Sequence, residues 1–253
     1  MIDPNQPDFN NSPIESTWAD KFKPVDLTLD PVISIITPFY NTGEIFYETA
    51  KSVLNQSLQQ FEWIIVDDGS TSDISRAILN HYANLDPRVR VVRHSENKGL
   101  SAARNTGIKA SSTDYLLMID SDDLIEPTAA EIWFWHLKTH QEIYFVDSYH
   151  VAFGGKNYLW TGGIHDGAMI LEKNRISMIC MVRKSAFELC GGFDESLWEG
   201  LEDWDFWLNC ASKGIWGDTI PEFLGWYRVR KDHSDRWKNL TEEGLSIYQA
   251  NIR

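Results

Sequence analysis

Short apolar runs alternate with segments of helical spacing along the first half of the chain, and this alternation limits the fold more than any other feature. Apolar runs typical of buried strands lie at residues 32–37, 61–66, 89–92 and 115–119. Helical spacing lies between and after them, at residues 44–56, 73–82, 101–110 and 127–137. Strands that alternate with helices of this length predict an α/β fold, in which helices cover both faces of a mostly parallel sheet.

The second half of the chain is less regular. We expect strands at residues 142–146 and 223–229, helices at 183–190 and 202–212, and a loop or hairpin in the glycine-rich stretch 154–167. Residues 1–31 hold five of the nine prolines and predict an extended leader. The predicted organisation is that leader, one compact domain over residues 32–235 with halves 32–125 and 126–235, and a helical tail over 236–253.

The charge of the chain excludes two classes of partner. There are 37 Asp and Glu residues against 23 Lys and Arg, a formal net charge of −14. Such an acidic chain has no electrostatic basis for binding nucleic acid or an anionic membrane surface. It contains no apolar run of about 18 residues, so no membrane span is expected. The three cysteines form no CxxC pair and predict reduced, buried thiols, as in a soluble cytoplasmic protein. The oligomeric state stays open.

Carboxylates gather where the predicted strands end. Asp67 and Asp68 follow the second apolar run, and Asp120, Asp122 and Asp123 follow the fourth. Ligands of open α/β sheets bind at the carboxyl ends of the strands. Five carboxylates at one edge favour a hard divalent cation, Mg²⁺ or Mn²⁺, which in turn can hold the phosphates of a substrate. The alternative is that these aspartates cap the following helices and turns.

Seven segments, in order, resemble one known family, the inverting glycosyltransferases of family 2, which have the GT-A fold. They are ISIITPFYN from Ile33, SVLNQS from Ser52, IIVDDGSTS from Ile64, NKGLSAARNTGIK from Asn97, YLLMIDSDD from Tyr115, GGFDE from Gly191 and EDWDFWL from Glu202. The resemblance covers roughly residues 32 to 230. It implies a Rossmann-like mixed sheet in one domain, with a nucleotide-sugar half followed by an acceptor half.

The resemblance also implies roles for residues of the first half. Asp120-Ser121-Asp122 matches the family's DXD motif, with Asp122 as the main metal ligand beside Asp120. Tyr40 matches the residue that covers the nucleobase, and Asp68 matches the acid that accepts the imide N–H of uracil; guanine offers a similar N–H. The expected nucleotide-sugar site comprises Thr37, Pro38, Tyr40, Asn41, Asp68, Arg104, Asp120 and Ser121. An ion pair with Asp67 or Asp68 is the alternative for Arg104.

In the second half, Glu202-Asp203 matches the family's ED motif, and the resemblance implies that Asp203 is the general base. The alternative is that both are acids favoured by the dipole at a helix N-terminus. The family often carries a metal-binding histidine soon after a Tyr-Arg pair. Here His233 stands five residues beyond Arg228, which makes it the weakest metal candidate. The QxxRW motif of processive synthases is absent from the sequence.

The sequence thus predicts a metal-dependent, inverting glycosyltransferase. It is expected to move a sugar from a nucleoside diphosphate sugar, with UDP favoured, to a hydroxyl of a carbohydrate or glycoconjugate. Two alternatives stay open: a sugar nucleotidyltransferase, and a non-catalytic module that binds nucleotide sugars. The first requires a basic, glycine-rich loop after the first strand, whereas residues 37–43 contain no Lys or Arg.

Overall fold

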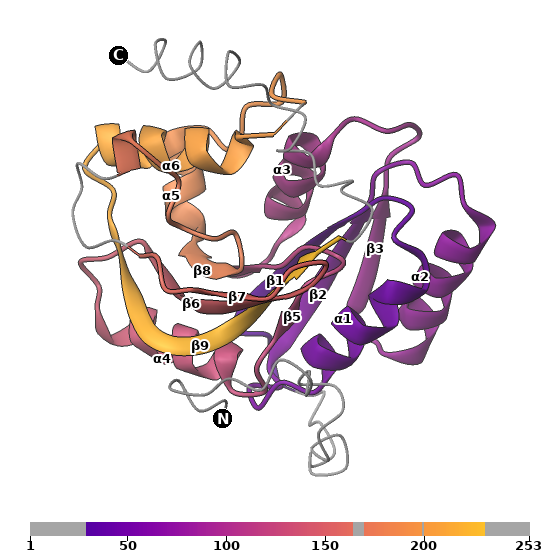
Figure 1. The fold of residues 1–253 in the computed structure, drawn as a ribbon. Coiled ribbons are helices and arrows are strands. Elements are labelled where there is room, and N and C mark those ends of the chain that lie inside the picture. The colour runs from indigo at the N-terminus through magenta and orange to yellow at the C-terminus, as the bar shows by residue number, and fades with distance from the viewer. Residues whose placement is uncertain (1–28, 164–169, 199, 231–253) are drawn as a thin grey trace.

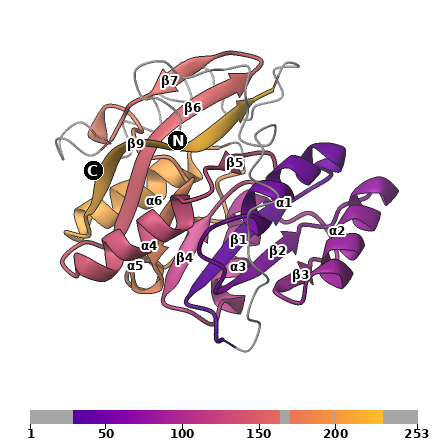
Figure 2. The ribbon, with the colours of Figure 1, turned by 90° about the horizontal axis from the view of Figure 1, so that it is seen from below.

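The computed structural model describes residues 29–163, 170–198 and 200–230, which form one curled sheet of nine strands with helices on both faces (Figures 1 and 2). The strands are β1 (Ile33–Phe39), β2 (Phe61–Asp67), β3 (Val89–Arg93), β4 (Tyr115–Met118), β5 (Leu124–Ile125), β6 (Phe145–Gly154), β7 (Tyr158–Trp160), β8 (Cys180–Arg183) and β9 (Gly217–Val229). The helices are the 3-10 turn η2 (Gly43–Ile45) and α1 (Phe46–Leu54), α2 (Asp73–Leu85), α3 (Leu100–Ala110), α4 (Ala129–Thr139), α5 (Lys184–Cys190) and α6 (Glu202–Ser212).

The first half is parallel and follows the predicted alternation. β1 is buried along its whole length and lies between β2 and β4, with β3 beyond β2. Phe39 pairs in register with Asp67, so β1 and β2 end at the same edge. A strand buried on both faces needs apolar residues at nearly every position, which explains the continuous runs in the sequence.

The second half departs from the expectation. β8 is antiparallel to both β4 and β6, and β6 then runs parallel to β9. The strand expected at 142–146 begins at Phe145 and extends to Gly154, and the one expected at 223–229 begins at Gly217. Irregular register around Tyr149 accompanies the bend of this pair in Figure 1. β7 pairs antiparallel with the end of β6 and forms a hairpin, one of the two expectations for residues 154–167. The sequence did not predict β5 or β8, which are too short for periodicity to mark.

Two apolar layers hold the helices. α1, α2 and α4 pack on one face of the sheet around Trp63, and α3, α5 and α6 pack on the other around Phe206. In the second layer the Trp207 ring lies 4.4 Å from the ring of Phe145. This buried contact fastens α6, the helix that begins with Glu202 and Asp203, to the sheet.

The expected leader and tail fall mostly on residues 1–28 and 231–253, outside the described residues. Among the helices that the structure does describe, none has the length and apolar character needed to cross a membrane.

Candidate active site

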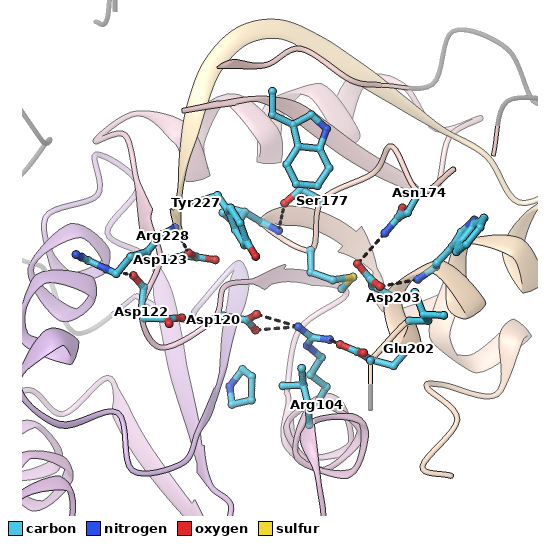
Figure 3. A pocket seen from close by; sticks show the side chains of 18 of the residues that line it. Arg104, Asp120, Asp122, Asp123, Asn174, Ser177, Glu202, Asp203, Tyr227 and Arg228 are labelled. Carbon is cyan, nitrogen blue, oxygen red and sulfur yellow. Dashed lines mark hydrogen bonds and ion pairs between the residues drawn. The ribbon is translucent and has the colours of Figure 1, made fainter. Parts of the chain in front are cut away.

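A pocket of about 1170 Å³ opens where β1, β2 and β4 end. Pro38 and Tyr40 reach it from β1 and its loop, Asp68 from the loop after β2, and the turn 120–123 from the end of β4. Its other wall is formed by residues 158–162, residues 172–179 and the start of α6 (Figure 3). The pocket therefore brings together the two predicted halves of the site.

Arg104 lies at the centre of this arrangement. It comes from α3, is 2% exposed, and donates to Asp120 at 2.9 and 3.1 Å and to Glu202 at 2.7 Å. Burial lowers the pKa of Arg104, but the charges of Asp120 and Glu202 outweigh burial and hold that pKa above its ordinary value. Arg104 thus joins the end of β4 to α6, and neither Asp67 nor Asp68 is its ion-pair partner within the described residues.

The turn after β4 holds Asp122 and Asp123 next to two further arginines. Asp122 Oδ2 lies 2.7 Å from Arg230, and the Asp122 carbonyl accepts from Arg228 at 2.7 Å. Asp123 Oδ1 accepts the backbone N–H of Arg228 at 2.7 Å. Burial raises the pKa of Asp122, and burial together with the neighbouring aspartates raises that of Asp123 well above its ordinary value. Negative charge is therefore crowded at this turn.

Asp68 occupies a fixed position at the start of α3. Its carboxylate accepts the backbone N–H groups of Lys98 and Gly99, each at 2.9 Å, and contacts the His94 ring at 2.6 Å. Oδ1 contacts both His94 and the N–H of Lys98, whereas Oδ2 accepts only the N–H of Gly99. Oδ2 therefore keeps one lone pair for a ligand. Part of the alternative interpretation of the strand-end acids is thus correct, because Asp68 does hold a turn.

The other residues predicted to bind the nucleotide sugar divide into two groups. Pro38 and Tyr40 line the pocket, and the Tyr40 side chain is exposed. Thr37 is fully buried and accepts from the indole of Trp63 at 2.9 Å. Asn41 lies outside the pocket lining, and its side chain holds the loop after β2 by accepting the N–H groups of residues 71 and 72.

Ser121 lines the pocket, but its hydroxyl contacts that of Thr42 at 2.6 Å and its carbonyl accepts from Thr49 at 3.0 Å. These bonds connect the turn after β4 to the loop and helix after β1. The contacts of Ser121, like those of Thr37 and Asn41, position the loops of the site.

Asp203 lies at the first turn of α6, facing the pocket. Leu201, the residue immediately before α6, has φ 67°, a left-handed conformation that turns the chain into the helix. Asp203 Oδ1 accepts the N–H of Trp204 at 2.8 Å, and Oδ2 accepts the amide of Asn174 at 2.8 Å. Burial and the nearby charge of Glu202 raise the pKa of Asp203 to about 7, although Arg104 opposes the shift. A carboxylate with this pKa can exchange a proton near neutral pH.

Among the polar residues of the pocket to which sequence reasoning gave no role are Asn174, Arg228 and Arg230. The two arginines stand in the Tyr-Arg-Val-Arg run at the end of β9, where their charge could have suggested partners for the strand-end acids. Asn174 has no signal in the sequence, since it lies in an irregular segment 29 residues from Asp203.

The predicted metal ligands that the structure describes are carboxylates. Over residues 29–163, 170–198 and 200–230, no group of three or more His, Cys, Asp or Glu side chains is arranged around a common point. His233 lies outside the described residues. Asp120 and Asp122, the two predicted metal ligands among the described residues, both line the pocket, where Asp120 is paired with Arg104 and Asp122 with Arg230.

The chain and its fold match known proteins. Residues 34–193 match the family described as Glycosyl transferase family 2. Chondroitin synthase of Escherichia coli is 32% identical over 199 residues, which are 77% of this chain and 29% of that one. The chain thus spans about a third of the length of this relative and of two uncharacterized glycosyltransferases from Rickettsia bellii and Rickettsia conorii.

Two solved structures share the architecture. S. aureus TarS 1–349 in complex with UDP-GlcNAc superposes with a TM-score of 0.72 at 18% identity, covering 87% of this chain and 66% of that one. The mannosyltransferase PcManGT of Pyrobaculum calidifontis, in complex with GDP-Man and Mn²⁺, gives 0.60 at 17% identity, covering 91% and 64%. At these identities the likeness concerns the fold. The family match over well over half of the chain, with this architecture, shows that the chain belongs to glycosyl transferase family 2 and has the GT-A fold.

Proposed function

We propose that the chain transfers a sugar from a UDP-sugar to a hydroxyl group of a carbohydrate or glycoconjugate, with inversion at the anomeric carbon and with a divalent metal. One observation carries the proposal. Asp122 and Asp203 lie on two sides of one pocket, and the Arg104–Asp120 pair lies between them (Figure 3). A donor held beside Asp122 and an acceptor held beside Asp203 would therefore meet.

The donor end has groups suited to a nucleoside diphosphate. The exposed ring of Tyr40 can stack on a base, a contact typically worth about 1–3 kcal/mol. Asp68 keeps a lone pair for an N–H of uracil, although guanine fits the same chemistry. TarS has been seen with UDP-GlcNAc and PcManGT with GDP-Man. UDP is our choice because the nearer of these two folds binds it.

The carboxylates after β4 fit a divalent cation. Magnesium and manganese are commonly held by one or two carboxylates and by substrate phosphates, and Asp120 and Asp122 supply such a pair. Burial is the main cause of the raised pKa of Asp122 and Asp123, and the charges of neighbouring aspartates add to it. A bound cation would favour the charged forms of both carboxyls. When bound, the ion would neutralise charge on the departing diphosphate. The Mn²⁺ in PcManGT supports this assignment.

The acceptor end supplies the base. As the acceptor oxygen forms its bond to the anomeric carbon, the bond from that carbon to the diphosphate oxygen breaks, and UDP leaves with the electron pair. The acceptor proton passes to Asp203, whose carboxylate has lone pairs left after its two hydrogen bonds. A single displacement of this kind inverts the carbon. Glu202 is occupied by Arg104, so we assign it the positioning of that arginine.

The two other functions have less support. A nucleotidyltransferase would need a basic loop after β1, but residues 37–43 of this chain contain no Lys or Arg. A binding module would not need an acid poised like Asp203. We also propose that the protein acts in the cytoplasm, because all three cysteines are buried free thiols.

Calorimetry of UDP binding tests the donor and metal assignments together. We expect Mn²⁺ to tighten UDP binding in the wild type, and Asp122→Asn to weaken binding in Mn²⁺ at least about tenfold, which is about 1.4 kcal/mol. Without metal the two proteins should bind alike. Unchanged metal-dependent affinity in the variant would show that Asp122 does not hold the ion.

A further inference from the structure

The carboxylate of Asp203 has two hydrogen-bond partners of different origin. One is the N–H of Trp204, its neighbour on α6, at 2.8 Å. The other is the side-chain amide of Asn174, at 2.8 Å, which comes from the segment between β7 and β8 (Figure 3). The first contact is local to α6, because it joins neighbouring residues. The second exists only because a distant segment brings a donor to it.

The orientation of the Asn174 amide is fixed by a second bond. Its Oδ1 accepts the backbone N–H of Ile176 at 3.2 Å, which leaves Nδ2 to face Asp203. The nitrogen of an amide donates hydrogen bonds and does not take up a proton at neutral pH. Asn174 can therefore hold the Asp203 carboxylate without competing for the proton of the acceptor.

The segment that carries Asn174 is anchored on both sides. Before it, the carbonyl of Ile170 accepts the indole N–H of Trp204 at 2.6 Å. After it, the N–H of Ser177 donates at 3.2 Å to Asp147, a buried carboxylate on β6. Asp147 is itself held by His150 at 2.8 Å. Asn174 thus sits between one tie to α6 and one tie to the sheet.

We infer that Asn174 is a positioning residue that orients the Asp203 carboxylate and favours its charged form, so that Asp203 can act as the base. This inference rests on the proposed role of Asp203. An N–H donor stabilises a carboxylate relative to the neutral acid. Removing that donor should make Asp203 harder to ionise and freer to rotate.

Several charged or titratable groups face Asp203 from neighbouring elements, and they set the background for this effect. Glu202 on α6 and Asp120 after β4 disfavour its charged form, and Arg104 on α3 favours it. The Cys180 thiol on β8 is close enough to feel its charge. Glu172, Lys173 and Arg175 line the same pocket from the segment of Asn174. None of these groups is altered by a change at Asn174.

The test compares Asn174→Ala with Asn209→Ala. Asn209 is also a partly buried asparagine, donates to the carbonyl of Cys190 at 2.8 Å, and does not line the pocket. The readout is UDP release from UDP-GlcNAc against pH in Mn²⁺. For Asn174→Ala we expect the acid limb of the rate–pH profile to move up by about one pH unit. At pH values below that limb the rate should be about tenfold lower than in the wild type, and the KM for the sugar donor should be unchanged. Asn209→Ala should keep the wild-type profile.

A second readout does not depend on turnover. In protein with ¹³C-labelled aspartate carboxyls, the resonance missing from Asp203→Asn identifies Asp203, and its titration should shift by the same amount in Asn174→Ala. If Asn174→Ala unfolds, Asn174→Asp serves instead and should shift the titration further, because it adds a like charge. An Asp203 titration and a rate profile equal to those of Asn209→Ala would overturn the inference. Wild-type UDP release by Asp203→Asn would overturn the proposed function itself.

Discussion

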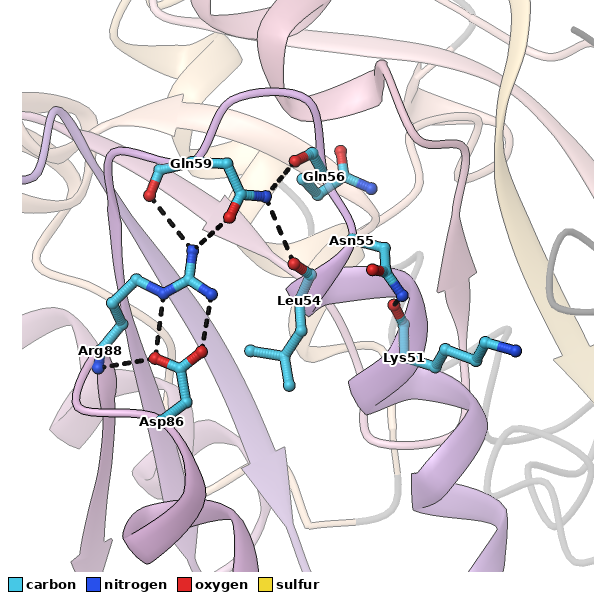
Figure 4. Close-up of polar contacts among 7 residues, drawn as sticks. All are labelled: Lys51, Leu54, Asn55, Gln56, Gln59, Asp86 and Arg88. Atoms are coloured by element: carbon cyan, nitrogen blue, oxygen red, sulfur yellow. Dashed lines mark hydrogen bonds and ion pairs between the residues drawn. The ribbon is translucent and has the colours of Figure 1, made fainter. Parts of the chain in front are cut away.

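Two arginines in this chain make the same kind of paired contact in different regions, and they differ in what they connect. Arg88 bonds to Asp86, two residues away, through Nε at 3.0 Å and Nη2 at 2.6 Å, and to Gln59 at 2.8 Å (Figure 4). Arg104 bonds to Asp120 and to Glu202, the latter 98 residues away. The first pair closes a turn. The second joins the turn after β4 to the helix that carries Asp203.

The surroundings of Arg88 show a purely structural network. Gln59, its partner, donates to the backbone carbonyls of Leu54 and Gln56, and nearby Asn55 donates to that of Lys51 (Figure 4). These bonds satisfy backbone carbonyls at the end of α1 and in the loop that follows it. Because Gln59 and Asn55 both donate to backbone carbonyls, the network shapes the connection between α1 and β2. Arg104 instead meets two carboxylates, Asp120 and Glu202, that line the pocket.

Arg104→Met should separate the two roles most strongly. The variant leaves Glu202 buried without its positively charged partner. It also leaves Asp120 without a cation to offset the negative charge of nearby Asp122. Loss of one partner of a buried pair costs about 3–5 kcal/mol, and we expect about 3 because Asp120 is a third exposed. Urea unfolding measures this loss, and UDP release should fall at least about a hundredfold.

Arg88→Met is the matched control. It removes a guanidinium that lies 4.2 Å over the Phe61 ring but leaves the pocket untouched. We expect a loss of about 1 kcal/mol in unfolding free energy and UDP release within about twofold of the wild type. Equal loss of UDP release in the two variants would show that Arg104 has no role beyond stability.

Glu202→Gln should have a smaller effect on rate than Arg104→Met. The amide oxygen can still accept from Arg104, so the tie to α6 persists. Loss of the charge lowers the pKa of Asp203, because Glu202 is one of the groups that raise it. The acid limb of UDP release should therefore move to lower pH, with a maximal rate within about tenfold of the wild type. A rate loss as large as that of Asp203→Asn would make Glu202 the base.

The same contrast explains what could be predicted from the sequence. Contacts that are local or periodic were accessible: the buried run of β1 and the helix from Glu202 both lie where expected. The partners of Arg104 were not, since charge alone favoured Asp67 or Asp68 and only the fold brings Glu202 to it. Asn174 illustrates the limit, because an amide in an irregular segment carries no pattern.

The two halves of the fold differ in the same way. Parallel strands buried on both faces give continuous apolar runs, so β1, β2 and β4 could be located. The short strands β5 and β8 depend on partners far along the chain, and their few residues fit several structures. The second half of the fold was therefore the hardest to derive.

The most direct test of the account is the rate of UDP release from UDP-GlcNAc against pH, for wild type and Asp203→Asn. Burial and Glu202 raise the pKa of Asp203 to about 7, so the acid is protonated below that pH and able to accept a proton above it. The wild-type rate should rise as pH passes about 7. The variant should bind UDP normally, lose that rise, and turn over about 10²–10⁴-fold more slowly. A variant that keeps both the wild-type rate and its pH dependence would contradict the assignment of Asp203 as the base.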